Sequence, residues 1–319
     1  MDQKNPGILK KLLARREASV LIALIVLCVA LSLMSPYFLK QRNIFSVLRQ
    51  ISAIAIMAVG QALIIITGGI DLSVGSMLGL MGVLTAVFST WHLPPVLVFL
   101  IVIFCGILMG SINGLLVTKV NITPFIVTIG MMNIARGLSL LITGGMPIHI
   151  DSSINFLGGG YLGPIPFSVI IMALIAVLGI LFASRTLPGR NVYAVGNNDR
   201  AAELSGVRVH RVKIMVYAIT GALCALAGII IGGTLNSADP NSGKGYEMDV
   251  IAAVILGGTS LSGGEGTIQG VLIGAALMGV LRNAFVLLGI SAYLQIVTIG
   301  VVIIGAVAID SFKTMQSSR

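Results

Sequence analysis

The chain has 319 residues, of which 56% are hydrophobic and only 10% are charged, and its mean hydropathy is +1.04. Soluble domains average about 25% charged residues, so this composition excludes a soluble globular protein. The net charge of +9 does not indicate a nucleic-acid partner, because the chain has no basic soluble module with groove-reading or stacking elements. Its apolar runs are continuous and about as long as a spanning helix, which excludes the alternating strands of a membrane barrel.

The apolar runs predict an all-α, polytopic membrane protein whose single transmembrane domain occupies residues 1–319. We expect about ten transmembrane helices. The eighth is the least regular, because only a short apolar stretch separates Asp249 from the glycine pair that follows it. In chain order the expected segments are 19–38, 44–66, 72–90, 95–117, 123–143, 165–184, 213–234, 249–258, 267–288 and 291–310.

The distribution of basic residues predicts how the chain is oriented in the membrane. Thirteen of the twenty Lys and Arg residues fall in segments 1–16, 185–213 and 313–319. Cytoplasmic loops carry an excess of basic residues, and an even number of crossings places both termini on one side. Both termini are therefore expected in the cytoplasm, together with 185–213, and the connections expected outside are 91–94, 144–164 and 235–248.

A decapeptide rich in glycine occurs twice, and the two copies begin 189 residues apart. Residues 66–75 read ITGGIDLSVG and residues 255–264 read ILGGTSLSGG, with six of ten positions identical. Each glycine costs about 1 kcal/mol against alanine inside a helix. Glycine-rich breaks at corresponding points of two halves are typical of transporters. The alternative is that two apolar, glycine-rich segments align through composition alone.

The first copy of the decapeptide contains Asp71, the only acidic residue between Glu17 and Asp151. A carboxylate deep in the bilayer costs at least about 2.5–3.5 kcal/mol, so Asp71 is expected at a helix break. There it either caps the next helix, alone or with Ser73, or serves as a gate or path residue, and the two roles can coexist. The candidates for a translocation path or gate are Gln61, Gly68, Gly69, Asp71, Ser73, Asn113, Gly257, Gly258 and Ser260.

Other polar and glycine residues within the apolar runs suggest helix contacts. Asn133 and Arg136 either line an aqueous path or make hydrogen bonds between helices, and for each residue singly the second role is the more frequent. Gly106, Gly110 and Gly114 form two successive GxxxG units, which allow helix backbones to approach closely. We expect this glycine face to pack within one chain.

The longest polar stretch, residues 185–213, contains a compact helix signal. Asn198 or Asp199 is a suitable N-cap, residues 201–204 favour helix, and Gly206 ends it. This order predicts a short cytoplasmic helix that docks a soluble partner. The alternative is a plain basic loop that joins two spanning helices.

No catalytic motif or cofactor site is predicted. Cys28, Cys105 and Cys224 are far apart in apolar runs, and the three histidines have no metal-ligand spacing. The phosphate-binding pattern GxxxxGK[ST] does not occur in the sequence. The chain is therefore expected to be non-catalytic and not to hydrolyse ATP itself.

Several separated phrases of the sequence resemble the permease subunits of bacterial ABC sugar importers of the ribose-transporter class. The resemblance covers almost the whole chain, and this class is related to branched-chain amino acid permeases. The phrases that carry it are 58–76 (AVGQALIIITGGIDLSVGS), 124–130 (PFIVTIG), 136–137 (RG), 189–197 (GRNVYAVGN) and 245–266 (GYEMDVIAAVILGGTSLSGGEG).

The resemblance implies a permease in the bacterial inner membrane that moves a ribose-like monosaccharide by alternating access. Its implied partners are a cytoplasmic ATP-binding subunit, a periplasmic sugar-binding protein, membrane lipid and a second copy of the chain or a paralogous permease. In such importers the loop after the sixth helix carries the coupling helix, which corresponds here to residues 197–207. The coupling candidates are Asn198, Asp199, Arg200, Glu203 and Gly206.

Two alternatives remain open from the residues. A stand-alone secondary transporter or channel needs an intramembrane relay of Asp, Glu or His, and Asp71 alone supports one poorly in the first half. An importer of a non-sugar solute, such as a branched-chain amino acid, fits the same broad resemblance.

Overall fold

The computed structural model describes residues 16–150 and 153–317, and most of them are helical. Each of the ten expected segments contains a helix. These helices are α2 (Arg16–Met34), α3 (Gln41–Ile66), α4 (Val74–Thr90), α5 (Pro95–Thr118), α6 (Pro124–Thr143), α8 (Phe167–Arg185), α11 (Val209–Leu235), α12 (Tyr246–Leu256), α13 (Ile268–Leu287) and α14 (Ala292–Ser317).

Within the described ranges, six helices are long and apolar enough to cross a membrane: α3, α5, α6, α8, α11 and α13. Shorter apolar helical stretches lie in α2, α4 and α14. The chain is thus a multi-pass membrane protein. The eleven residues of α12 make it the shortest of the ten, because the second glycine-rich decapeptide ends it.

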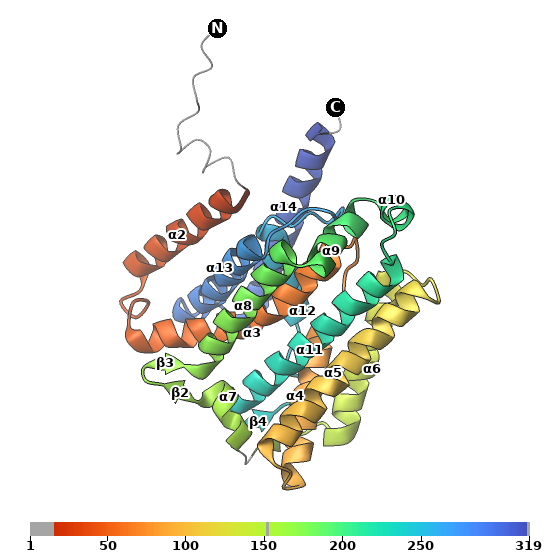
Figure 1. The fold of residues 1–319 in the computed structure, drawn as a ribbon. Helices are drawn as coiled ribbons and strands as arrows, with labels where there is room; N and C mark the ends of the chain where they lie inside the picture. Colours follow the sequence, from red (N-terminus) through yellow and green to blue (C-terminus); the bar gives the residue numbers. More distant parts are fainter. Residues whose placement is uncertain (1–15, 151–152, 318–319) are drawn as a thin grey trace.

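Short elements connect the long helices at both ends of the bundle (Figure 1). One end carries α9 (Leu187–Asn197) and α10 (Asp199–Leu204). The opposite end carries η1 (Ser153–Asn155), α7 (Phe156–Gly159) and four two-residue strands. Strand β1 (Ile148–His149) pairs antiparallel with β4 (Ser237–Ala238), and β2 (Tyr161–Leu162) pairs antiparallel with β3 (Ile165–Pro166).

The core of the molecule is built around α3 and α11. Every residue from Ile51 to Ile66 of α3 is buried, which explains why this helix has no polar face. Helix α11 packs most extensively on α5, then on α4 and α3. The outer helices expose large apolar side chains, such as Leu33 of α2, Leu141 of α6 and Tyr293 of α14, which suits a surface in contact with lipid.

The GxxxG face of α5 packs against α11 within the chain, which confirms the intrachain prediction. A Cβ atom at Gly106 would lie 2.4 Å from the Gly221 carbonyl oxygen, and one at Gly110 would lie 2.2 Å from that of Tyr217. Neither neighbour is the end of a flexible side chain, so the two backbones meet where only glycine fits.

Gly110→Ala is expected to lower the stability of the purified protein. The added methyl group overpacks a backbone contact, and overpacking costs about 1–3 kcal/mol. Thermal unfolding in detergent measures the effect. Gly130→Ala on α6 is the matched control, because nothing lies within 4 Å of its added Cβ. Equal midpoints for the two variants would contradict this packing.

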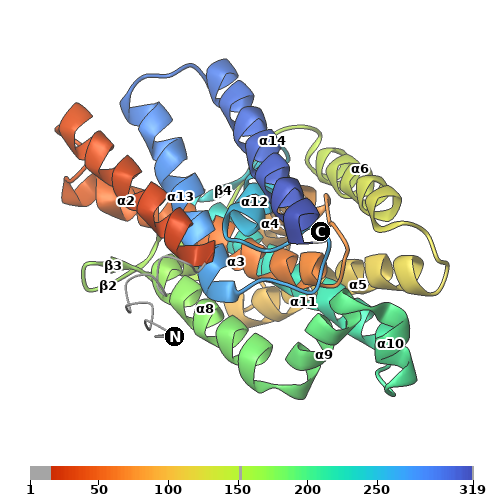
Figure 2. The ribbon, with the colours of Figure 1, turned by 90° about the horizontal axis from the view of Figure 1, so that it is seen from above.

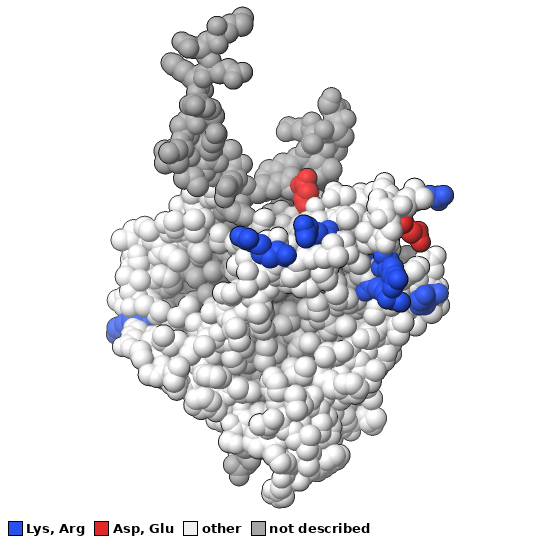
Figure 3. All heavy atoms as spheres, viewed as in Figure 1, with Lys and Arg blue, Asp and Glu red and all other residues white. Residues whose placement is uncertain are grey.

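The charged residues mark one end of the bundle. The start of α2 and the end of α14 lie at the same end as α9 and α10 (Figure 1). In the view of Figure 3, most Lys and Arg side chains gather near α9 and α10, and the broad surface below them is uncharged. Residues 1–15, which hold most of the first basic segment, and Asp151 lie outside the described residues.

Candidate functional site

The short helix expected in the polar stretch is α10. Its N-cap is Asn198, whose side-chain oxygen accepts a hydrogen bond from the Ala201 N–H at 2.9 Å. At its end, the Val207 N–H donates to the Ala202 carbonyl and the Gly206 N–H donates to the Glu203 carbonyl, with Gly206 at φ +86°. This is a Schellman motif, so the predicted cap, helix and glycine stop are all present.

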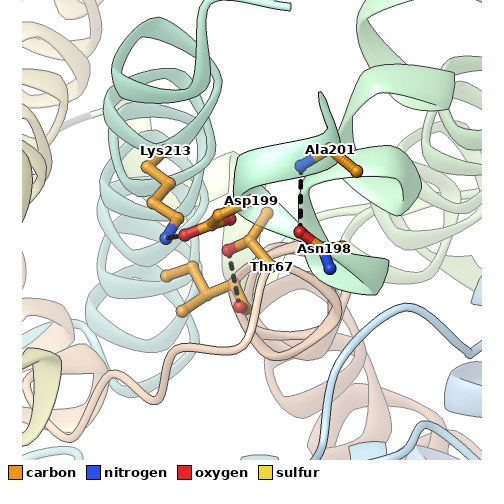
Figure 4. Close-up of polar contacts among 6 residues, drawn as sticks. Thr67, Asn198, Asp199, Ala201 and Lys213 are labelled. Carbon is orange, nitrogen blue, oxygen red and sulfur yellow. Dashed lines mark hydrogen bonds and ion pairs between the residues drawn. The ribbon is translucent and has the colours of Figure 1, made fainter. Parts of the chain in front are cut away.

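Asp199 and Ala202 hold α10 to the bundle, whereas other side chains of this helix are exposed. Asp199 forms an ion pair with Lys213 of α11 (Figure 4), and Ala202 is buried. Arg200 and Glu203 are exposed. Leu204 is 84% exposed, although it lies at the charged end of the molecule. No signal in the sequence had singled out Leu204.

Helix α9 precedes α10 and was not predicted, since the only helix signal identified within the polar stretch lies at 198–206. Proline is tolerated in the first turn of a helix, and Thr186 caps this one by accepting a hydrogen bond from the Gly189 N–H at 3.0 Å. The end of α9 is tied to the second decapeptide region, because the Tyr193 hydroxyl donates to the Gly266 carbonyl at 3.0 Å. Burial raises the pKa of Tyr193, so this hydroxyl stays a donor.

The last turn of α9 lies where the two decapeptides meet. The Gly264 N–H of the second copy donates to the Ile66 carbonyl of the first at 2.9 Å. A Cβ atom on Gly196 would lie 1.7 Å from that same carbonyl oxygen and 2.6 Å from the Gly264 nitrogen. Gly196 therefore touches the backbone of both copies, and we call this three-way contact the glycine junction.

Both decapeptides end a helix in the same way. After α3, the Gly69 N–H donates to the Ile64 carbonyl, with Gly68 at φ +79°. After α12, the Thr259 N–H donates to the Val254 carbonyl, with Gly258 at φ +89°. Each is a Schellman motif closed by a left-handed glycine. The repeat aligns Gly68 with Gly257, whereas the left-handed glycine of the second motif is Gly258. The second motif therefore lies one residue later than the alignment of the repeat predicts.

We call the turn that follows α3 the first turn and the turn that follows α12 the second turn. A buried polar network supports the first turn. The Asp71 Oδ1 atom accepts hydrogen bonds from the Ser73 N–H at 2.7 Å and the Ser73 hydroxyl at 2.5 Å. The Asn113 side chain donates to the Ser73 hydroxyl at 3.1 Å. The Gln61 amide faces the Asp71 backbone, and in the orientation that satisfies both groups it accepts from the Asp71 N–H at 3.1 Å. All four side chains are buried.

An apolar cluster joins the two turns. Ile251 and Ile255 of α12 are buried there. The residues that pack on them come from the first turn, the second turn and α14: Ile70, Leu72, Leu256, Leu261 and Val307. We call these seven residues the inter-turn cluster.

The path and gate candidates thus fall into two groups. Gln61, Asp71, Ser73 and Asn113 come together as the network that holds the first turn. Gly68, Gly69, Gly257, Gly258 and Ser260 lie in the turns themselves, where Gly68 is exposed and Gly69, Gly257 and Ser260 are buried.

Asn198→Ala is expected to fray α10, because loss of an N-cap side chain costs about 1 kcal/mol, and to lower import if the chain has the function that the sequence resemblance implies. Asn198→Asp keeps an acceptor for the Ala201 N–H and should behave like the wild type. Import by the reconstituted complex, measured for both variants, checks this expectation. If both variants lose import equally, the cap is not what the position supplies.

The family described as "branched-chain amino acid transport system / permease component" matches residues 43–307. The chain belongs to this permease family. No solved structure matches it.

The permease has curated relatives that align with it over almost their whole length. The ribose import permease of Haemophilus influenzae is 42% identical over 301 residues, covering 93% of each chain. That of Bacillus subtilis is 42% identical over 296 residues, covering 92% of each chain. The galactose/methyl galactoside import permease of Escherichia coli is 36% identical over 318 residues, covering 93% of this chain and 95% of that one.

Proposed function

We propose that the chain is the membrane-spanning permease subunit of an ABC importer and moves a ribose-like monosaccharide across the bacterial inner membrane. The observation that carries this proposal is the 42% identity to ribose import permeases over 93% of both chains. The similarity to a galactose/methyl galactoside permease supports the wider class of monosaccharides. The chain itself is proposed to be non-catalytic and to need no cofactor.

In this proposal the chain crosses the membrane ten times, with α9, α10 and both termini in the cytoplasm. The basic side chains near α9 and α10 (Figure 3) support that orientation through the excess of Lys and Arg in cytoplasmic loops. A cytoplasmic ATP-binding subunit, a periplasmic sugar-binding protein and a second copy of the chain, or a paralogous permease, complete the importer. The solute path is proposed to lie between the two permeases.

The coupling element is proposed to be α10. Asn198 and Gly206 fix its two ends, Asp199 ties it to α11 through Lys213, and the exposed Arg200, Glu203 and Leu204 contact the ATP-binding subunit. Movement of α10 passes through the last turn of α9 to the glycine junction. From there it reaches the ends of α3 and α12 together, because Gly196 touches both decapeptides.

The two turns are proposed to form the gate on the cytoplasmic side. The inter-turn cluster closes the space between them with apolar side chains, and the Asp71 network keeps the first turn in register with α4 and α5. Alternating access then requires the turns to separate when the ATP-binding subunits change state. A few kcal/mol of difference between the two states is enough to shift their populations.

Uptake into proteoliposomes that contain this permease with its ATP-binding subunit tests the proposal. Radiolabelled ribose, galactose and leucine are each supplied with a matching binding protein, with ATP or without it on the nucleotide-binding side. We expect ATP-dependent uptake of a sugar. Sugar uptake that is independent of ATP would favour a stand-alone transporter, and uptake of leucine alone would overturn the substrate class.

A further inference from the structure

A cavity of about 240 Å³ lies between α4, α6 and the segment that leads into α12. Seen from above, α4 and α12 lie near the centre of the bundle and α6 lies at its edge (Figure 2), where α6 packs on α4. The polar and charged residues that line the cavity are Ser76, Asn133, Arg136, Asn241, Lys244 and Glu247. Such a group of side chains is unusual in a chain with only 10% charged residues.

The cavity lies at the depth of the middle of a spanning helix. Helix α6 has 20 residues, and Asn133 and Arg136 are its tenth and thirteenth. At 1.5 Å per residue, they lie roughly 14 and 18 Å from its start. Ionisable side chains at such a depth face a water-filled cavity or the interior of the protein, because lipid cannot solvate them. Asn133, on the same stretch of α6, is exposed.

The segment 239–247 reaches this depth from the end of the bundle that carries β4, and specific contacts hold it there. The Arg136 Nη1 atom donates to the carbonyls of Pro240 at 2.9 Å and Ser242 at 3.2 Å. Two glycines of α4 allow the segment to pack closely on this helix. A Cβ atom on Gly75 would lie 2.4 Å from the Gly243 carbonyl oxygen, and one on Gly79 would lie 2.6 Å from the Ser242 carbonyl oxygen. The cavity is therefore built by defined contacts.

Among the described residues, the polar groups of the cavity keep hydrogen-bonding capacity. The two hydrogen bonds that Arg136 donates to the segment both involve Nη1, although a guanidinium has five N–H donors. The Glu247 Oε1 atom accepts from the Gly245 N–H at 3.2 Å, whereas Oε2 is buried beside Gly75 of α4 without a hydrogen-bond partner among the described residues. In the same part of the chain, the Asn133 side chain donates to the Ile129 carbonyl of its own helix.

We propose that this cavity is a sugar-binding subsite on the solute path of the permease. The inference rests on the proposed function and adds where the solute is held. Neighbouring hydroxyls of a sugar both donate and accept hydrogen bonds, and amide, guanidinium and carboxylate groups around one cavity match both roles.

Thiol labelling of the reconstituted complex tests the proposal. Cys28, Cys105 and Cys224 are first replaced by alanine, and ribose import by that background is confirmed. Asn133→Cys is then treated with a charged, membrane-impermeant thiol reagent applied from the side of the binding protein, with and without saturating ribose. We expect rapid labelling, slowed at least several-fold by ribose. Ile134→Cys on the neighbouring face of α6 is the matched control and should label slowly in both conditions.

The outcomes separate the subsite from the proposed function. If the background complex imports ribose but Asn133→Cys labels no faster than Ile134→Cys, the cavity is not on the path and the inference fails. If labelling is fast and leucine slows it while ribose does not, the substrate class is wrong. Failure of the wild-type complex to import any sugar overturns the proposed function itself.

Discussion

Gly196→Ala is expected to abolish most ATP-driven import while leaving the protein in the membrane. The new Cβ atom would lie 1.7 Å from the Ile66 carbonyl oxygen and 2.6 Å from the Gly264 nitrogen, so the last turn of α9 must move away from both decapeptides. Coupling between two sites is typically about 1–3 kcal/mol, equivalent to about 5–150-fold. We therefore expect import to fall within that range, as measured by sugar uptake into proteoliposomes.

The basal ATP hydrolysis of the Gly196→Ala complex distinguishes uncoupling from misfolding. It should remain near the wild-type level, because the substitution leaves in place the exposed α10 side chains that we propose contact the ATP-binding subunit. Gly300→Ala on α14 is the matched control, since nothing lies within 4 Å of its Cβ position, and it should import normally. Wild-type import by Gly196→Ala would show that the glycine junction carries no coupling.

Asp71→Ala is expected to lower the yield of folded permease severely, whereas Asp71→Asn should keep most of it. Alanine removes the acceptor for the Ser73 N–H and the Ser73 hydroxyl, and each buried group left unsatisfied costs about 1–3 kcal/mol. Asparagine retains an oxygen in place of Oδ1. The recovery of monodisperse protein in detergent and its unfolding midpoint measure both effects.

Import by the Asp71→Asn variant distinguishes two roles of Asp71. If Asp71 positions the first turn through hydrogen bonds, the asparagine variant should import at close to the wild-type rate. If Asp71 carries a proton or an ion, the neutral variant should fold normally and lose import. That second result would favour the stand-alone transporter and contradict a purely positioning role for the Asp71 network.

Local signals in the sequence predicted the helices well. Continuous apolar runs indicate the long helices because their length and polarity are properties of the segment itself. The same holds for α10, whose cap at Asn198 and stop at Gly206 lie within nine residues of each other. The missed helix α9 has a local explanation too: Pro188 and Gly189 are poor helix formers, although Thr186 caps a helix that begins beside them.

The candidate site was predicted only in part, because its geometry depends on contacts between distant segments. The repeat identified both turns, but nothing in it places Gly196 between Ile66 and Gly264. Asn133 and Arg136 were noted as polar residues of one helix. Their relation to Glu247 appears only once segment 239–247 packs on the glycines of α4.

We propose that α10 connects this permease to an ATP-binding subunit. The ATPase activity of the reconstituted complex, measured with and without a ribose-loaded binding protein, tests this connection directly. Leu204, 84% exposed at the tip of α10, is replaced by aspartate or by methionine. We predict that Leu204→Met retains stimulation, because a similar apolar contact remains, and that Leu204→Asp loses it together with co-purification of the ATP-binding subunit. Full stimulation of the Leu204→Asp complex would contradict this coupling role of α10.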